Sequence, residues 1–172
     1  MDFPHKISTL LYGFNAQDEV LLLHRTREPN RGRWSPPGGK LKTWLGESPY
    51  RCACREAGEE MNLALSESDL RLTGLVSEAA YQGTTHWLMF LFEIRRKLEK
   101  PPPPHEEGVF AFYSRTALDR LDLPDTDRDF LWPQFWKHRG GFFAAHGIWS
   151  SASEVSWHLE ESIHGTSHRP QQ

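Results

Sequence analysis

One segment, residues 36–63, constrains the fold more than any other part of the chain. It begins with two prolines and a glycine pair and ends with three crowded glutamates. Its second half predicts a helix, because Ser48 is a suitable N-cap and Pro49 fits the first helical position. Asn62 tolerates the left-handed backbone that commonly ends a helix. The chain is therefore expected to place a tight glycine loop directly before a capped helix.

The three glutamates of this helix share one side of it. At about 100° per residue, Glu56, Glu59 and Glu60 fall within an arc of about 100°, beside small neighbours. Like charges four residues apart destabilise a bare helix by roughly 0.2–0.5 kcal/mol. A divalent cation bound between them would make the same pair stabilising. Carboxylate oxygens suit Mg²⁺ or Mn²⁺. Spacing alone leaves a second interpretation open, a solvated helix face supported by an Arg55–Glu59 pair.

The bulk composition fits one globular domain. A chain of 172 residues with 38% hydrophobic residues can bury a sizeable core. No apolar run approaches 18 residues and no signal peptide is apparent, so neither a membrane span nor secretion is expected. The net charge of −3 gives no global attraction to nucleic acid or to anionic membranes. Cys52 and Cys54 would point to different sides of a helix, so reduced thiols in a cytoplasmic protein are expected.

The remaining pattern predicts a mixed sheet covered by helices. A turn at residues 16–19 joins two strand-like runs and suggests a hairpin, and four consecutive prolines predict an extended loop. Pro133 should kink a late helical segment or mark its true start. The expected strands are 6–15, 19–26, 70–80, 85–96 and 109–115, the further helices 116–121 and 125–140, and a final hairpin 141–151.

The order of the charged residues adds a second argument. Gly39, Glu47, the pair Arg55–Glu56 and the pair Glu59–Glu60 resemble the Nudix box, G-x5-E-x7-R-E-U-x-E-E-x-G-U, in which U is aliphatic. All five fixed charged positions are present, and seven residues separate Glu47 from Arg55. The stretches 23–40 and 105–127 also look like segments of that family. The resemblance therefore covers roughly residues 5–140.

Three departures from the box need to be stated. Ala57 stands where a larger aliphatic residue is usual, and Asn62 stands where the box ends in glycine. Seven residues instead of five separate Gly39 from Glu47, which is a two-residue insertion. The insertion lies in the loop that enters the glutamate helix. We expect it either to displace Gly39 or to reshape the mouth of the substrate site.

The resemblance implies a fold and an activity. The fold is of the α/β (α+β) class, a Nudix-type α/β/α sandwich with a mixed β-sheet. One domain would span residues 1–162, with a C-terminal extension from about 141, and residues 163–172 would form a flexible tail. The activity is hydrolysis of a phosphoric anhydride bond in a nucleoside diphosphate linked to another group. Mg²⁺ or Mn²⁺ is the implied cofactor and a small-molecule nucleotide the implied partner, without nucleic acid or membrane, while a homodimer stays open.

The resemblance also implies residue roles. The metal ligands would be the Gly39 carbonyl and the carboxylates of Glu56, Glu59 and Glu60. Arg55 would orient a glutamate rather than touch phosphate. The catalytic set would include Glu47, as a structural partner or an outer metal ligand. A further acid from outside the box would act as ligand or general base, with Glu107 chosen over the alternatives Glu106 and Glu78.

One group of relatives, the oxidised-purine nucleoside triphosphatases, suggests a substrate. They carry Trp-Pro-Asp-Asp where this chain has Leu-Pro-Asp-Thr at 123–126, and an Asn where this chain has Ser35. Ser35, Asp125 and Asp127 are therefore the candidate base-reading residues, and Arg25 and Arg33 the candidate phosphate-binding residues.

The resulting lead substrate is an oxidised purine (d)NTP, hydrolysed to the nucleoside monophosphate and pyrophosphate. The alternative substrates are a nucleotide sugar, ADP-ribose or a dinucleoside polyphosphate. A different class of hypothesis is a catalytically weak nucleotide-binding module with the same fold. An unrelated structural protein with a plain acidic helix is the third class, which the complete charged pattern opposes.

Overall fold

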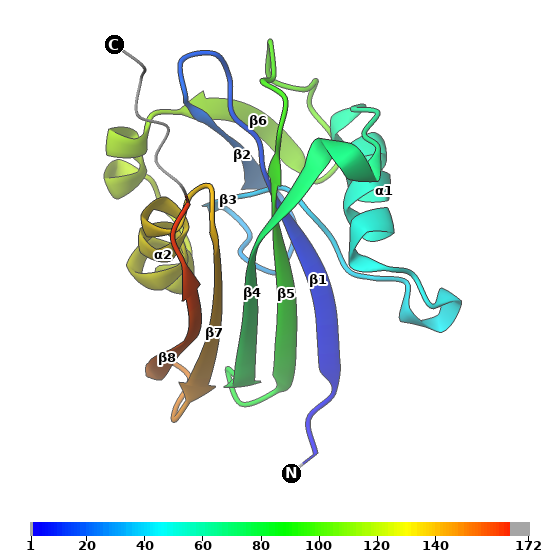
Figure 1. The fold of residues 1–172 in the computed structure, drawn as a ribbon. Coiled ribbons are helices and arrows are strands. Elements are labelled where there is room, and N and C mark those ends of the chain that lie inside the picture. Colours follow the sequence, from blue (N-terminus) through cyan, green and yellow to red (C-terminus); the bar gives the residue numbers. More distant parts are fainter. Residues whose placement is uncertain (1, 166–172) are drawn as a thin grey trace.

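Two β-sheets lie between helices in the computed structural model, which describes residues 2–165 (Figure 1). The larger sheet has the order β1-β5-β4-β7-β8 and is mixed, because β1 with β5 and β4 with β7 are parallel and the other pairs antiparallel. The smaller sheet, β3-β2-β6, is antiparallel. The strands are β1 His5–Tyr12, β2 Val20–Arg25, β3 Trp34–Ser35, β4 Leu70–Tyr81, β5 Thr85–Ile94, β6 Gly108–Tyr113, β7 Phe142–Trp149 and β8 Val155–Ile163.

The two α-helices lie on opposite sides of the sheets, which confirms the predicted α/β/α sandwich (Figure 1). Short helical turns connect the strands, and the last of them, η4, is wound as a π-helix that leads directly into α2. The helical elements are α1 Pro49–Met61, α2 Trp132–Lys137, η1 Thr43–Leu45, η2 Glu67–Asp69, η3 Arg115–Arg120 and η4 Asp127–Leu131. Pro133 lies in the first turn of α2, so it marks the start of that helix.

Helix α1 forms where the sequence predicts it and for the predicted reasons. The Ser48 hydroxyl accepts a hydrogen bond from the Arg51 backbone N–H at 3.2 Å, and Pro49 opens the helix. Asn62 ends it in the left-handed conformation, with φ of 50°. The buried side of the helix packs against β1, β2, β5 and β6 in one apolar cluster, which contains Leu11, Leu21, Leu23, Ala53, Ala57, Met61, Phe92 and Phe110.

The predicted hairpin of residues 6–15 and 19–26 is wrong, although the turn between them forms. Asn15 caps that turn by accepting the backbone N–H groups of Gln17 and Glu19. Beyond the turn the strands separate, because β1 pairs with β5 and β2 pairs with β3 and β6. Both strands bury apolar side chains on both faces, and such a pattern indicates burial without specifying the partner strand.

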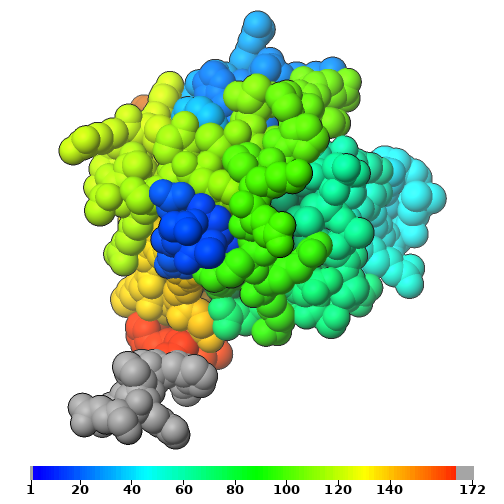
Figure 2. Space-filling model, turned by 90° about the horizontal axis from the view of Figure 1, so that it is seen from above, coloured from blue at the N-terminus to red at the C-terminus, as the bar shows by residue number. Residues whose placement is uncertain are grey.

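The β1–β2 turn is fastened to two distant segments. Asp18 makes ion pairs with Arg139, after α2, at 2.6 Å and with Lys97, after β5, at 3.0 Å. Figure 2 shows this turn in blue between the green and the yellow parts of the chain. The side chains of Arg139 and Lys97 hold the pKa of Asp18 at about 2. The turn thereby ties the first strand to the region that follows α2.

The C-terminal segment forms a hairpin longer than residues 141–151. Strands β7 and β8 pair antiparallel, and Ile163, the first residue of the predicted flexible tail, still pairs with Phe142. That tail prediction is therefore wrong at its start, and residues 166–172 lie outside the described residues. Among the described residues, no helix is long and apolar enough to cross a membrane.

The second apolar cluster lies between the large sheet and α2. Its centre is Phe135, which is fully buried and stacks on Tyr12 of β1 with ring centroids 4.4 Å apart. The cluster also receives side chains from β2, β4, β5, β7 and η4. Helix α2 is thus held by aromatic packing and not by its own length of six residues.

Replacing Phe135 with alanine should lower the free energy of unfolding by about 3–5 kcal/mol, because the buried ring leaves a cavity against Tyr12. Urea unfolding followed by tryptophan fluorescence measures this change. The exposed Trp44, 77% accessible, supplies the control, since its replacement by alanine should change stability by no more than about 0.5 kcal/mol. Equal effects of the two substitutions would contradict this account of the core.

Candidate functional site

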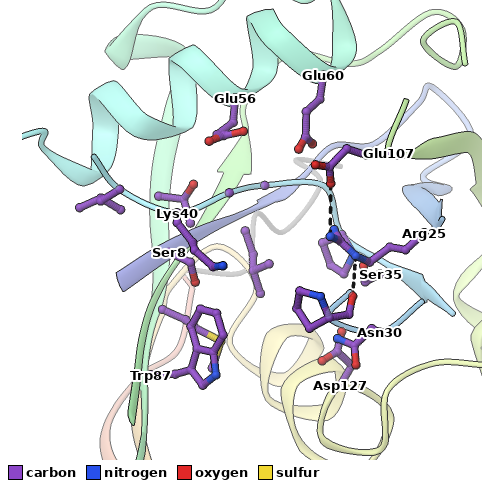
Figure 3. Close-up of a pocket in the computed structure, with 18 of the residues that line it drawn as sticks. Ser8, Arg25, Asn30, Ser35, Lys40, Glu56, Glu60, Trp87, Glu107 and Asp127 are labelled. Atoms are coloured by element: carbon purple, nitrogen blue, oxygen red, sulfur yellow. Dashed lines mark hydrogen bonds and ion pairs between the residues drawn. The ribbon is translucent and has the colours of Figure 1, made fainter. Parts of the chain in front are cut away.

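A cavity of about 510 Å³ opens between α1 and η4, over the face of the large sheet that carries α2 (Figure 3). The strand register determines its floor. Ser8 of β1 pairs with Met89 of β5, and Trp87 of β5 pairs with Glu78 of β4, so these side chains share one face. The glycine loop and α1 form one wall, and the loop before β3 together with η4 forms the other.

Arg55 of α1 binds several acids at the first wall. Its guanidinium donates to both carboxylate oxygens of Glu47 at 2.7 and 2.9 Å, to Glu56 at 2.6 Å and to Glu59 at 3.0 Å. It also donates to the Lys40 carbonyl at 3.1 Å. These bonds hold the pKa of Glu47 at about 2. Arg55 thus fastens the loop that carries Lys40 and Glu47 to the helix that carries the other glutamates.

The glycine loop lies close to both β1 and α1. The Gly39 carbonyl accepts the Thr9 N–H at 2.8 Å, and Leu41 donates to the Ile7 carbonyl at 2.9 Å, so the loop runs along β1. A side chain at Gly39 would overlap the carboxylate of Glu56. A larger residue at this position would displace the Glu56 carboxylate from its place beside the glycine loop.

The two-residue insertion does not displace Gly39, which keeps its contact with β1. The inserted residues extend outward from the loop. It is accommodated by the η1 turn, which ends at Gly46 in the left-handed region with φ of 63°. Trp44 and Leu45 of this turn are 77% and 69% exposed. Trp44 also lines the cavity, so the insertion shapes the mouth of the site.

Two of the three helix glutamates face the cavity. Glu56 and Glu60 are 9% and 8% exposed, and Figure 3 shows both side chains directed from α1 toward the glycine loop. Burial raises the pKa of Glu56. Burial, followed by the neighbouring carboxylates of Glu56 and Glu107, raises the pKa of Glu60 to about 8. The third, Glu59, has a side chain 54% exposed and lies between Arg55 and Lys42.

This end of the cavity fits a divalent cation. Oε2 of Glu60 is buried and has no hydrogen-bond partner among the described residues, which is costly unless a positive group approaches it. The Glu56 carboxylate lies beside it against Gly39. Within residues 2–165, no three His, Cys, Asp or Glu side chains form a complete cage. Mg²⁺ needs no such cage, since it commonly binds one or two carboxylates together with water and substrate phosphates.

The acids outside the helix separate into three places. Glu107 lines the cavity, is close enough to Glu56 and Glu60 to raise their pKa values, and makes an ion pair with Arg25 at 3.2 Å (Figure 3). Glu106 instead pairs with Arg27 at the surface. Glu78 lies on β4, away from the helix glutamates. Of the three candidates, Glu107 is therefore the one that the structure brings to the glutamate cluster.

The far end of the cavity holds a second acidic pair. Glu78 is 3% exposed and Asp127, at the start of η4, is 9% exposed. Burial, followed by the neighbouring Asp127, raises the pKa of Glu78 to about 8. Burial raises the pKa of Asp127 to about 7, against a smaller lowering by Arg33. Burial thus raises the pKa of both acids, as it does for Glu60 at the other end of the cavity, whereas Arg55 lowers that of Glu47.

The remaining predicted residues divide between the cavity and the surface. Arg25 and Ser35 line the cavity. Arg33 and Asp125 are absent from its lining, and Asp125 has a side chain 70% exposed that pairs with Arg128 at 2.8 Å. Sequence reasoning missed several lining residues, because no motif marks them: Ser8, Asn30, Lys40, Trp44 and Trp87. For Trp87 the strand alternation predicts only which face it occupies.

Comparison with known proteins adds a family match. The model described as NUDIX domain matches residues 4–133. The MutT protein of Bacillus halodurans is similar in structure, with a TM-score of 0.72 and 22% identity over 90% of this chain and 97% of that one. The MutT protein of Methanosarcina mazei Go1 has a TM-score of 0.66 and 24% identity, over 78% and 95% of the two chains. The NUDIX domain of Shewanella oneidensis NrtR, solved with ADP ribose, has a TM-score of 0.59 and 15% identity, over 77% and 86%.

Replacing Glu78 with glutamine should make stability less dependent on pH. The folded protein keeps the Glu78 proton up to about pH 8, whereas the unfolded chain releases it near 4.5. The free energy of unfolding therefore falls as pH rises between these values, by up to about 1.4 kcal/mol per pH unit for this group. Urea unfolding at several pH values between them should give a shallower slope for Glu78→Gln.

The exposed Glu67, replaced in the same way, is the matched control and should leave the slope unchanged. A Glu78→Gln variant with the slope of the unmodified protein would mean that Glu78 is ionised in the folded state.

Proposed function

Because this chain belongs to the NUDIX domain family, whose hydrolases act on phosphoric anhydride bonds, we propose that it is a Mg²⁺-dependent pyrophosphohydrolase of nucleoside triphosphates. The lead substrate is an oxidised purine (d)NTP, and the products are the nucleoside monophosphate and pyrophosphate. The observation that carries the proposal is the buried, partnerless oxygen of Glu60 beside Glu56, at one end of a cavity that extends to a second polar end.

The residues at the glutamate end have distinct proposed roles. Glu56, Glu60 and the Gly39 carbonyl would hold the cation, and Glu59 would join them or act through Arg55. When bound, Mg²⁺ neutralises phosphate oxygens and lowers the pKa of a coordinated water. Arg55 keeps the carboxylates of Glu47 and Glu56 oriented through its bonds to them.

Glu107 and Arg25 are proposed to act on the reacting water and on the phosphates. Glu107 lies beside the glutamate cluster, and its Oε2 accepts a hydrogen bond from Arg25 Nη2 at 3.2 Å. That position suits a general base that takes a proton from the attacking water. Arg25, which lines the same wall, offers further N–H groups that suit phosphate oxygens.

A cavity of about 510 Å³ with apolar surface along its length supports the choice of a base-bearing substrate. The cavity extends from Glu60 to Asp127. Met89, Trp87 and Leu131 line it and offer apolar surface to a ring. The structure of the NrtR domain carries ADP ribose, so a nucleoside diphosphate with a sugar is the alternative to be tested beside the triphosphates.

The proposed activity predicts release of pyrophosphate, and not of single phosphate, from an 8-oxo-dGTP sample in the presence of Mg²⁺. Product analysis by ion-exchange chromatography identifies the monophosphate. The same assay should include dGTP, ADP-ribose, a nucleotide sugar and a dinucleoside polyphosphate. A faster turnover of one of the last three would replace the lead substrate, and failure to hydrolyse any of them would contradict the enzyme assignment.

Replacing Glu60 with glutamine should lower turnover by at least about 100-fold while leaving the fold intact. Loss of a metal ligand is expected to exceed the roughly 10- to 100-fold losses seen when outer partners of a site are removed. The neutral amide removes a buried charge, so thermal stability in the absence of Mg²⁺ should not fall. Glu67→Gln, an exposed change shortly after α1, is the matched control. Full activity of Glu60→Gln would show that the metal assignment is wrong.

A further inference from the structure

The η1 turn carries an aromatic side chain that the proposed hydrolysis does not use. Trp44 is 77% exposed, and it also lines the cavity. The next residue, Leu45, is 69% exposed and is absent from the lining. A single exposed apolar residue such as Leu45 is ordinary on a protein surface. An indole at the mouth of a ligand cavity is instead placed to contact what the cavity binds.

The backbone around Trp44 is fixed by hydrogen bonds at the base of the turn. The Leu45 N–H donates to the Lys42 carbonyl at 2.9 Å. Oε2 of Glu47 accepts the Lys42 N–H at 2.8 Å and a guanidinium N–H of Arg55 at 2.9 Å. The carboxylate that fastens the loop to α1 thus also closes the turn. Because the indole stands on a held backbone, it loses less conformational freedom on binding a ring than it would on a mobile loop.

The turn lies at the glutamate end of the cavity. Nζ of Lys42 is 3.9 Å from the Glu59 carboxylate. Figure 1 shows the turn in cyan beside the start of α1, on the opposite side of the molecule from α2. Asp127, which lines the far end, begins the η4 segment that leads into α2. Trp44 and Asp127 therefore stand at opposite ends of one cavity, with the glutamates nearer to Trp44.

This order along the cavity decides which part of a nucleotide reaches Trp44. In the proposed function the base lies on the apolar floor and the phosphates lie at Glu56 and Glu60, where a nucleoside triphosphate ends. Trp44 is then placed to contact a group attached to the terminal phosphate. Lys40 and Lys42, which precede Trp44 in the chain, also line the cavity. Their ammonium groups suit the oxygens of a phosphate chain that continues toward the indole.

We propose that Trp44 is the stacking platform of a second subsite, which takes a flat ring carried by the terminal phosphate of the substrate. The inference rests on the proposed function in placing the phosphates at the glutamates. Bases stack on aromatic side chains without specific hydrogen bonds, so the subsite accepts a flat ring of any identity. A nucleoside triphosphate leaves it empty, and a nucleotide with a second ring fills it. The loop that departs from the box thereby acquires a role in substrate choice.

Two nucleotides that differ only by one terminal nucleoside test the inference separately from hydrolysis. Guanosine 5′-tetraphosphate has no second ring, whereas diguanosine tetraphosphate has the same phosphate chain with a guanosine at each end. Isothermal titration calorimetry with Ca²⁺ in place of Mg²⁺ gives both dissociation constants, since Ca²⁺ also binds carboxylate and phosphate oxygens. Chromatography of the cell contents after each titration confirms that the nucleotide is intact.

Two variants at position 44 carry the test. Trp44→Ala should weaken binding of diguanosine tetraphosphate at least about fivefold, because the stacking surface is lost, and should leave guanosine tetraphosphate within about twofold. Trp44→Phe should keep the binding of diguanosine tetraphosphate within about threefold of the unmodified protein, because a smaller flat ring still stacks. Thermal unfolding confirms that each variant is folded.

Leu45→Ala is the matched control, because Leu45 lies on the same turn with similar exposure and does not line the cavity. It should bind both nucleotides as the unmodified protein does. Equal weakening of the two nucleotides by Trp44→Ala, no weakening of either, or no binding to the unmodified protein would overturn the inference even if triphosphates are hydrolysed. Conversely, binding of the second ring that depends on Trp44, without turnover of any nucleotide, would support the subsite and contradict the proposed hydrolysis.

Discussion

The set of bonds made by Arg55 is the constraint on which the site depends. One guanidinium holds Glu47 on the loop and Glu56 and Glu59 on the helix, and it also binds the Lys40 carbonyl. Without a positive group at their centre, acids so close together would repel one another and raise each other's pKa. The loop before the helix can therefore carry a two-residue insertion. Glu47 follows the insertion in the chain, and its bonds to Arg55 fix the end of the loop to the helix.

Buried acids lie at both ends of the cavity, and the two ends differ in the positive charge beside them. At the glutamate end, Arg55 binds Glu56, while burial still raises the pKa of Glu60, whose Oε2 has no hydrogen-bond partner among the described residues. At the far end burial likewise raises the pKa values of Glu78 and Asp127, and no arginine or lysine within residues 2–165 makes an ion pair with either acid. An ionised acid suits a metal or a phosphate-bound water, whereas a neutral acid can donate a hydrogen bond.

Local features of the structure could be predicted from the sequence, and long-range ones could not. Helix α1 begins after Ser48 and ends at Asn62 as predicted, because capping is decided by neighbouring residues. The hairpin prediction was wrong because strand partners are chosen across the fold, not by the turn that joins two strands. The sequence marks Glu78 only as a candidate acid for the metal, since nothing in it shows that the β4–β5 register sets Glu78 opposite Trp87, at the other end of the cavity.

The C-terminal hairpin supports the cavity from beyond the segment that matches the family model, which ends at residue 133. Strand β7 extends the large sheet, and Gly147 leaves room beside Glu78 and for the ring of Trp157. Trp157 of β8 then stacks on Phe130 and holds η4 over the sheet. A chain without β7 and β8 would keep the glutamates and Arg55, but it would lose the support for Asp127. The glutamate end of the cavity is thus built by residues of the box, and the far end, lined by Glu78 and Asp127, is supported by strands beyond the matched segment.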